Sequence, residues 1–184
     1  PPSSSVTLDF AATDKNKIPL KMRWLDGGIR PPHPDLIPAN DSLGTPDSGN
    51  GVMMIGSKGI ITTGVYGFTP KLYRKGEEVV EFDTSNQPGN EFGHQTKWVQ
   101  ACKAGFNSSE HKALTSSFDY SGPMTETVLM GNIAIRSYME KKSGLGNAFP
   151  GRKKLLWDGD AMKITNYEDA NKYVTRDYRK GWEI

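Results

Sequence analysis

The chain has 184 residues, enough for one domain with a substantial core that needs neither disulfides nor a structural metal. Its 23 basic and 21 acidic side chains give a net charge of +2 without a basic block, which argues against a nucleic acid as partner. One cysteine, Cys102, excludes a disulfide framework and a multi-cysteine zinc site. No apolar run approaches the roughly 18 to 20 residues that span a bilayer, so no membrane partner is expected.

The beginning of the chain predicts a fragment of a longer protein. It starts on Pro1-Pro2 without an initiator methionine and passes within a few residues into a strand pattern. Such a start is typical of a cut at a domain boundary or of a processed terminus, and we expect residues 1–184 to form a single domain. The start shows neither the charged nor the apolar region of a signal peptide. The sequence predicts a soluble chain but leaves the compartment open, cytoplasmic or exported.

The first half of the chain reads as three consecutive hairpins. Residues 5–10 alternate between apolar and polar, and residues 20–24 do so again until Asp26-Gly27-Gly28 stops the run. Residues 29–50 carry five prolines and predict a long surface loop. Strand patterns then return, with turn residues between the members of each pair. The later pairs are predicted at residues 51–56 with 60–65, and at 71–74 with 77–82.

Two helices are expected in the second half. A polar loop at residues 83–90 precedes a helix at 94–103, on which Trp98, Val99 and Cys102 share a face. The main helix, predicted to begin near Ser121 and Pro123, then carries an apolar stripe that we interpret as core. Its small members, Gly131 and Ala134, indicate the close approach of another backbone. The stripe consists of Met124, Val128, Gly131, Ile135 and Tyr138, and is widened by Leu129, Ile133 and Ala134.

The C-terminal part adds short elements. A strand pair is expected around the turn at Asp158-Gly159, and Asn166 is predicted to cap a short last helix. Strands first and helices later are typical of an α+β domain. The sequence thus predicts a mostly antiparallel, open β-sheet with helices packed on one face.

Several kinds of site are not predicted. The chain has no GxGxxG turn, so no nucleotide cofactor is expected to bind to it alone. The three histidines, His33, His94 and His111, form no HxxxH pair, and no metal is expected. Cys102, on an apolar helix face, is interpreted as a core residue and not as a nucleophile. No catalytic residue is assigned.

Three residues are candidates for binding a substrate. Trp24 and Asp26 lie where a strand meets the long loop, and could hold a polyol by ring stacking and carboxylate hydrogen bonds. A core tryptophan and a turn aspartate are the competing interpretations. His94 opens its helix and titrates near neutral pH, although a neutral or exposed structural histidine is the alternative.

Taken together, five blocks resemble the C-terminal domain of the Gfo/Idh/MocA oxidoreductases, the relatives of glucose–fructose oxidoreductase and inositol dehydrogenase. They occur in the family's order and cover most of the chain, with closest likeness to the bacterial subgroup that ends in YRKGW. The blocks are WLDGGIRPP (24–32), GVMMIGSKGIITTGVYGFTPKLY (51–73), HQTKWVQACKAG (94–105), FDYSGPMTETVLMGNIAIRS (118–137) and NKYVTRDYRKGWEI (171–184).

The resemblance implies a dihydrodipicolinate-reductase-like domain that binds a sugar or cyclitol and mediates a homo-oligomer. It also implies an N-terminal Rossmann domain, absent from this chain, that holds NAD or NADP. The family's EKP-type lysine and its catalytic histidine motif have no match here. His94 matches the histidine that often opens the HxxxW helix in relatives, which makes it a pocket candidate. The alternative is a carbohydrate-binding or scaffold module without redox chemistry.

Overall fold

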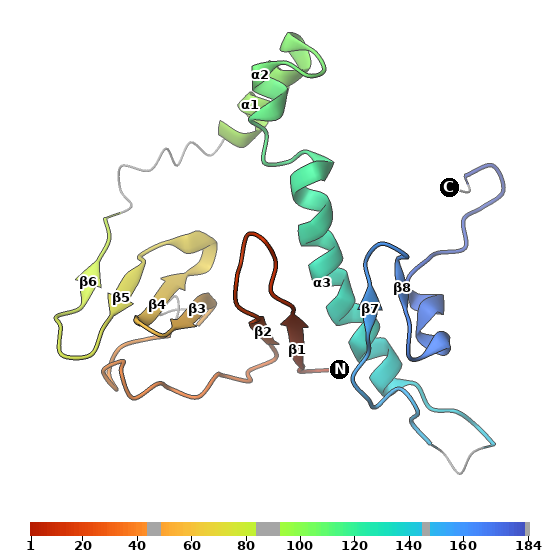
Figure 1. Cartoon of the computed structure of the whole chain (residues 1–184), viewed down its shortest axis with the longest axis horizontal. Coiled ribbons are helices and arrows are strands. Elements are labelled where there is room, and N and C mark those ends of the chain that lie inside the picture. The colour runs from red at the N-terminus through yellow and green to blue at the C-terminus, as the bar shows by residue number, and fades with distance from the viewer. Residues whose placement is uncertain (44–48, 84–92, 145–147, 183–184) are drawn as a thin grey trace. The chain divides into compact units, whose positions relative to one another are not determined.

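The structure, a computed structural model, describes residues 1–43, 49–83, 93–144 and 148–182. The chain divides into two compact units, one formed by Pro1–Arg30 with Ala113–Ile184 and the other by Pro31–Lys112 (Figure 1). Both contain short antiparallel strands and helices, so the fold is a mixed one. The grouping of all 184 residues into a single domain stays a prediction.

The first unit opens with the predicted hairpin. Strand β1 (Ser5–Phe10) pairs antiparallel with β2 (Leu20–Leu25), with Val6 opposite Trp24. Val6 is buried, and its side chain lies against Gly131 of the main helix. The interpretation of these two segments as strands of one hairpin is confirmed.

The main helix, α3 (Phe118–Met139), begins earlier than predicted. Its first helical residue follows Ser117, so the predicted start at Ser121 is wrong and Pro123 lies inside the helix. A proline at this position removes one intrahelical donor. The missing N–H would have bonded the carbonyl of Asp119, four residues earlier. The Thr127 hydroxyl donates to the carbonyl of Pro123 at 2.9 Å.

The buried face of α3 also differs from the prediction. Within this helix Ile133 and Ser137 are the buried residues. Met124, Val128 and Tyr138 are exposed by 57%, 62% and 55%, so the interpretation as core is wrong for these three, whereas Ile133 of the same stripe is buried. A helical period identifies an apolar face, but it does not say whether the same chain covers it.

The core of the first unit lies where α3 meets the C-terminal elements. These are β7 (Trp157–Asp158), β8 (Lys163–Ile164) and the 3-10 helix η2 (Glu168–Tyr173). They surround a cluster of buried side chains, against which Leu155, Trp157, Tyr167, Tyr173 and Val174 pack. The buried members are Ile133, Ile164 and Ala170.

Two asparagines organise this segment. Asn171 binds the backbone of Ile164 twice, accepting from its N–H at 2.7 Å and donating to its carbonyl at 3.0 Å. Asn166 accepts from Leu156 N–H and donates to the carbonyl of Lys154, both at 2.8 Å. Asn166 therefore does not cap η2, which is preceded by Tyr167, and that prediction is wrong.

The second unit contains a four-stranded antiparallel sheet in the order β3-β4-β5-β6. The strands confirm both predicted hairpins, although the last two are shorter than expected. In the part of the chain that the structure describes, the strands form three small sheets and not one open sheet. The four are β3 (Gly51–Gly56), β4 (Gly59–Gly64), β5 (Lys71–Tyr73) and β6 (Val80–Glu81). The 3-10 turn η1 (Val65–Gly67) follows β4.

One part of the predicted surface loop contributes to the core of this unit. Ile37 is buried together with Ile60 and Tyr73, so the expectation that residues 29–50 run over the surface is wrong for that residue. Residues 44–48 of this loop lie outside the described residues. The prolines around Ile37 prevent this segment from pairing as a strand. The segment is held to the sheet by the apolar side chain of Ile37, which packs against Ile60 and Tyr73.

The helices of the second unit are α1 (Gly93–Ala104) and α2 (Ser109–Lys112). On α1 the buried residue is Ala101, whereas Trp98, Val99 and Cys102 are exposed. The interpretation of Cys102 as core is therefore wrong. The predicted polar loop before α1 lies outside the described residues except for Asp83.

A partly buried hydrogen-bond network joins the long loop to the sheet. Asp41 accepts from the Tyr73 hydroxyl at 2.8 Å and from Lys71 Nζ at 3.2 Å, and Lys71 also contacts Glu81 at 3.0 Å. Burial raises the pKa of Asp41, but the hydrogen bonds from Tyr73 and Lys71 outweigh it, and the pKa lies below its ordinary value of 3.8.

Stability of the second unit should therefore depend on pH in acid. The ionised Asp41 stabilises the fold above the ordinary carboxyl pKa, and this contribution is lost as the pH falls through the lowered, folded-state pKa. Asp41→Asn should lower the free energy of unfolding by about 1 kcal/mol at neutral pH and by less in acid. Urea titrations across this range, with the exposed Asp14→Asn as control, measure it; equal losses at all pH values would contradict the assignment.

Candidate functional site

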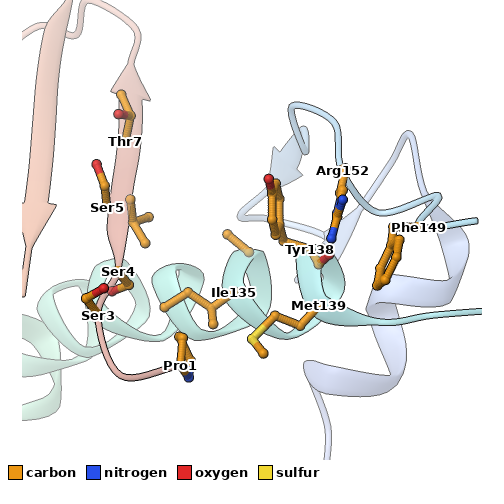
Figure 2. Close-up of a pocket in the computed structure, with 12 residues that line it drawn as sticks. Pro1, Ser3, Ser4, Ser5, Thr7, Ile135, Tyr138, Met139, Phe149 and Arg152 are labelled. Carbon is orange, nitrogen blue, oxygen red and sulfur yellow. Dashed lines mark hydrogen bonds between the residues drawn. The ribbon is translucent and has the colours of Figure 1, made fainter. Parts of the chain in front are cut away.

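A cavity of about 510 Å³ lies in the first unit, between β1 and the C-terminal half of α3 (Figure 2). Its volume falls in the range of about 300 to 1,000 Å³ that is usual for small-molecule sites. Three parts of the chain form its wall: the N-terminal segment with β1, the helix, and the loop before β7. The lining residues are Pro1, Ser3, Ser4, Ser5, Val6, Thr7, Ala134, Ile135, Tyr138, Met139, Phe149 and Arg152.

The helical wall follows from residue spacing on α3. Ala134 and Tyr138 are four residues apart, as are Ile135 and Met139, so each pair lies on one side of the helix. The small Ala134 leaves space that a larger side chain would fill. The helix thus supplies a mainly apolar surface with one phenol at its end.

Arg152 is the charged side chain of the lining, and two aromatic rings hold it. Its guanidinium carbon lies 3.8 Å from the ring centre of Phe149 and 4.9 Å from that of Tyr138. Its Nε also donates to the Tyr138 carbonyl at 3.4 Å. Figure 2 shows Arg152 between the two rings. Stacking of this kind orients a guanidinium and leaves its other N–H groups available.

The structure brings two of the three predicted site residues together. Asp26 Oδ2 accepts from Trp24 Nε1 at 3.0 Å and from the Ser4 hydroxyl at 2.8 Å, while its Oδ1 accepts from Ser4 N–H at 2.6 Å. Hydrogen bonds from Ser4, and then from Trp24, hold the pKa of Asp26 below its ordinary value. Because Ser4 lines the cavity, the pair borders the site through this serine.

The geometry decides between some of the alternatives for this pair. Trp24 is 61% exposed, so it is not a core tryptophan. Asp26 has the structural role of a turn aspartate, since it fastens the N-terminal segment to the end of β2. Gly27 is required there, because it has φ of +63° and a Cβ would lie 2.3 Å from the Pro2 carbonyl oxygen.

His94 lies elsewhere. It is the second residue of α1, in the second unit, and its side chain is exposed. The structure thus groups Trp24 with Asp26 but does not assign His94 to the cavity. Its role as a pocket residue stays a prediction.

Sequence reasoning missed the residue with the most distinctive chemistry, Arg152. The available signals were the serine run at residues 3–5 and the basic GRKK segment at 151–154. Neither indicates a site without knowledge that β1 and the loop after α3 come together. Such contacts between residues far apart in the chain carry no local pattern.

The cavity can bind but offers little acid–base chemistry. Among the described residues, those that line it include no aspartate, glutamate, histidine, lysine or cysteine. Among the residues that the structure describes, no group of three or more potential ligands could hold a metal ion. In the same part of the chain no helix is both long and apolar enough to cross a membrane. No protein-family model and no curated protein matches the chain.

Proposed function

We propose that this chain is the substrate-binding and oligomerisation domain of an NAD(P)-dependent oxidoreductase that acts on a sugar or cyclitol. The observation that carries the proposal is the cavity beside α3, which combines apolar walls, polar groups of the N-terminal segment and one oriented guanidinium. A polyhydroxylated ring has an apolar C–H face and a rim of hydroxyls, and therefore needs both kinds of surface.

The redox half of the proposal rests on the resemblance to the Gfo/Idh/MocA C-terminal domain, with its dihydrodipicolinate-reductase-like fold. In that arrangement a Rossmann domain outside this chain binds NAD or NADP and supplies the catalytic groups. The described lining of the cavity agrees with catalytic groups that come from the Rossmann domain, because this lining holds no general base. This chain then contributes binding and orientation of the substrate.

Oligomerisation, or docking of the Rossmann domain, is supported by apolar side chains on the surface. In β3, Val52, Met54 and Ile55 are each more than half exposed. Within the described residues β3 pairs on one side only, with β4, so its other edge keeps unpaired backbone groups. Apolar surface of this kind usually marks an interface.

A non-catalytic carbohydrate-binding or scaffold module is the second candidate. The observation that favours it is again the lining, which can hold a ligand but cannot by itself move a proton. The two candidates differ in the sequence that precedes Pro1. A G-x-G-x-x-G fingerprint there supports the oxidoreductase, and its absence supports the module.

The test is to express the complete reading frame and to follow NAD(P)H absorbance with a panel of sugars and cyclitols. We expect turnover of at least one of them by the complete protein. The 184-residue chain alone should bind neither NAD nor NADP in calorimetry, because it lacks a glycine-rich turn for the pyrophosphate. Saturable dinucleotide binding at micromolar concentrations by this chain would overturn the proposal.

A further inference from the structure

We propose that the cavity beside α3 is selective for a sugar acid, whose carboxylate binds Arg152. The inference rests on the proposed function and adds the substrate class. It follows from three features of the lining: a guanidinium without an acidic partner among the described residues, apolar walls, and polar groups of the N-terminal segment and of the β1 backbone.

Arg152 has no acidic partner among the described residues, unlike three lysines of its unit. Lys142, Lys154 and Lys172 each form an ion pair, with Asp169, Asp9 and Glu140 respectively. No ion pair among the described residues involves Arg152, whose polar contact is the Tyr138 carbonyl. A guanidinium carries five donors in a planar fork that matches a carboxylate. The N–H donors of Arg152 that do not bind the Tyr138 carbonyl can therefore bind an anionic ligand.

Stacking alone does not make the site. Arg136 lies over the Tyr173 ring at 4.2 Å, and it too has no acidic partner among the described ion pairs, but it does not line the cavity. At Arg152 the two stacked rings restrict the side chain, which reduces the entropy lost when a ligand binds. Arg152 is thus a cation that is held in one orientation and that lies beside open space for a ligand.

The rest of the lining fits a sugar better than a simple anion. Val6, Ala134, Ile135 and Met139 offer apolar surface for the C–H face of a pyranose ring. Ser5 and Thr7 lie on the face of β1 opposite Val6, so toward the cavity they present backbone groups, and Ser3 precedes the strand. β1 pairs with β2 on one side, so its other edge has further donors and acceptors. A hexuronate presents a carboxylate, a C–H face and ring hydroxyls together.

Isothermal titration calorimetry of the 184-residue chain tests this with four probes: D-glucuronate, D-glucose, inorganic phosphate and octanoate. Glucuronate should bind at least about tenfold more tightly than each of the others, as expected for a charge-assisted hydrogen bond added to sugar contacts. Arg152→Gln should remove the preference over glucose. The matched control is Lys153→Gln, which removes the neighbouring charge. Because Lys153 contacts the ring of Tyr167 outside the cavity, this variant should keep the preference for glucuronate over glucose.

A further variant keeps the test decisive if Arg152→Gln is poorly folded. Ala134→Leu fills the cavity without changing charge, and should weaken glucuronate and glucose alike. Equal affinity for glucuronate and glucose, or an unchanged preference in a folded Arg152→Gln, would overturn the sugar-acid inference and leave the proposed function standing. Phosphate or octanoate binding as tightly as glucuronate would also overturn it. If neither sugar binds, the proposed function loses its site as well.

Discussion

Replacing Ile133 with alanine is expected to lower the free energy of unfolding of the first unit by about 2 to 5 kcal/mol. Ile133 is 6% exposed and packs with Ile164 and Ala170 in the cluster that joins α3 to the C-terminal segment. Truncation removes buried methyl groups and leaves a cavity that the surrounding backbone cannot fully close. Urea unfolding followed by far-UV circular dichroism measures the change.

Val128→Ala is the control on the same helix. Its side chain is 62% exposed, so the loss should stay within about 0.5 kcal/mol. The helical pattern alone predicts a core loss at Val128 as well, because it assigns both residues to the apolar stripe. A larger loss at Val128 than at Ile133 would show that the stripe is buried in solution, for example against a second copy of the chain. Repeating the urea unfolding at several protein concentrations tests for burial against a second copy, because stability would then depend on concentration.

Local structure was the part most accessible from sequence. The hairpin at residues 5–25 and the strands at 51–64 were predicted because alternation and turn glycines act over a few residues. The main helix is also predicted, but its start is misplaced at Ser121 because proline is favoured in a first turn, whereas Pro123 lies inside α3. Propensity therefore favours the wrong start.

Burial and the site were less accessible, for a physical reason. The cavity joins β1 to Phe149 and Arg152, more than 140 positions away in sequence, and no local pattern encodes such a pairing. Asp26 was predictable because a carboxylate beside two glycines is typical of a turn, and it indeed accepts hydrogen bonds from Ser4. Arg152 became informative only once its two aromatic neighbours were known.

The position at which another segment comes closest to α3 was also not predictable from the sequence. The sequence places it at Gly131, on the apolar stripe of α3, but a Cβ there would meet Val6 Cγ1 at 3.9 Å, an ordinary contact. A strand side chain lies nearby, as expected, and yet a methyl group fits. The tight contact is at Gly151, where a Cβ would lie 2.1 Å from the Ser137 carbonyl oxygen and 2.6 Å from its carbon.

Opposite effects are therefore expected from the same substitution at these two glycines. Gly151→Ala should destabilise the first unit by roughly 1 to 3 kcal/mol, because the fully buried Ser137 backbone must move to admit the methyl group. Gly131→Ala should stabilise it by about 0.5 to 1 kcal/mol, since alanine is the better helix former and space is available. Thermal and urea unfolding of both variants measure the two signs. If Gly131→Ala destabilises the unit more than Gly151→Ala, β1 lies closer to α3 than the Val6 contact indicates. The description of the helical wall of the cavity is then wrong.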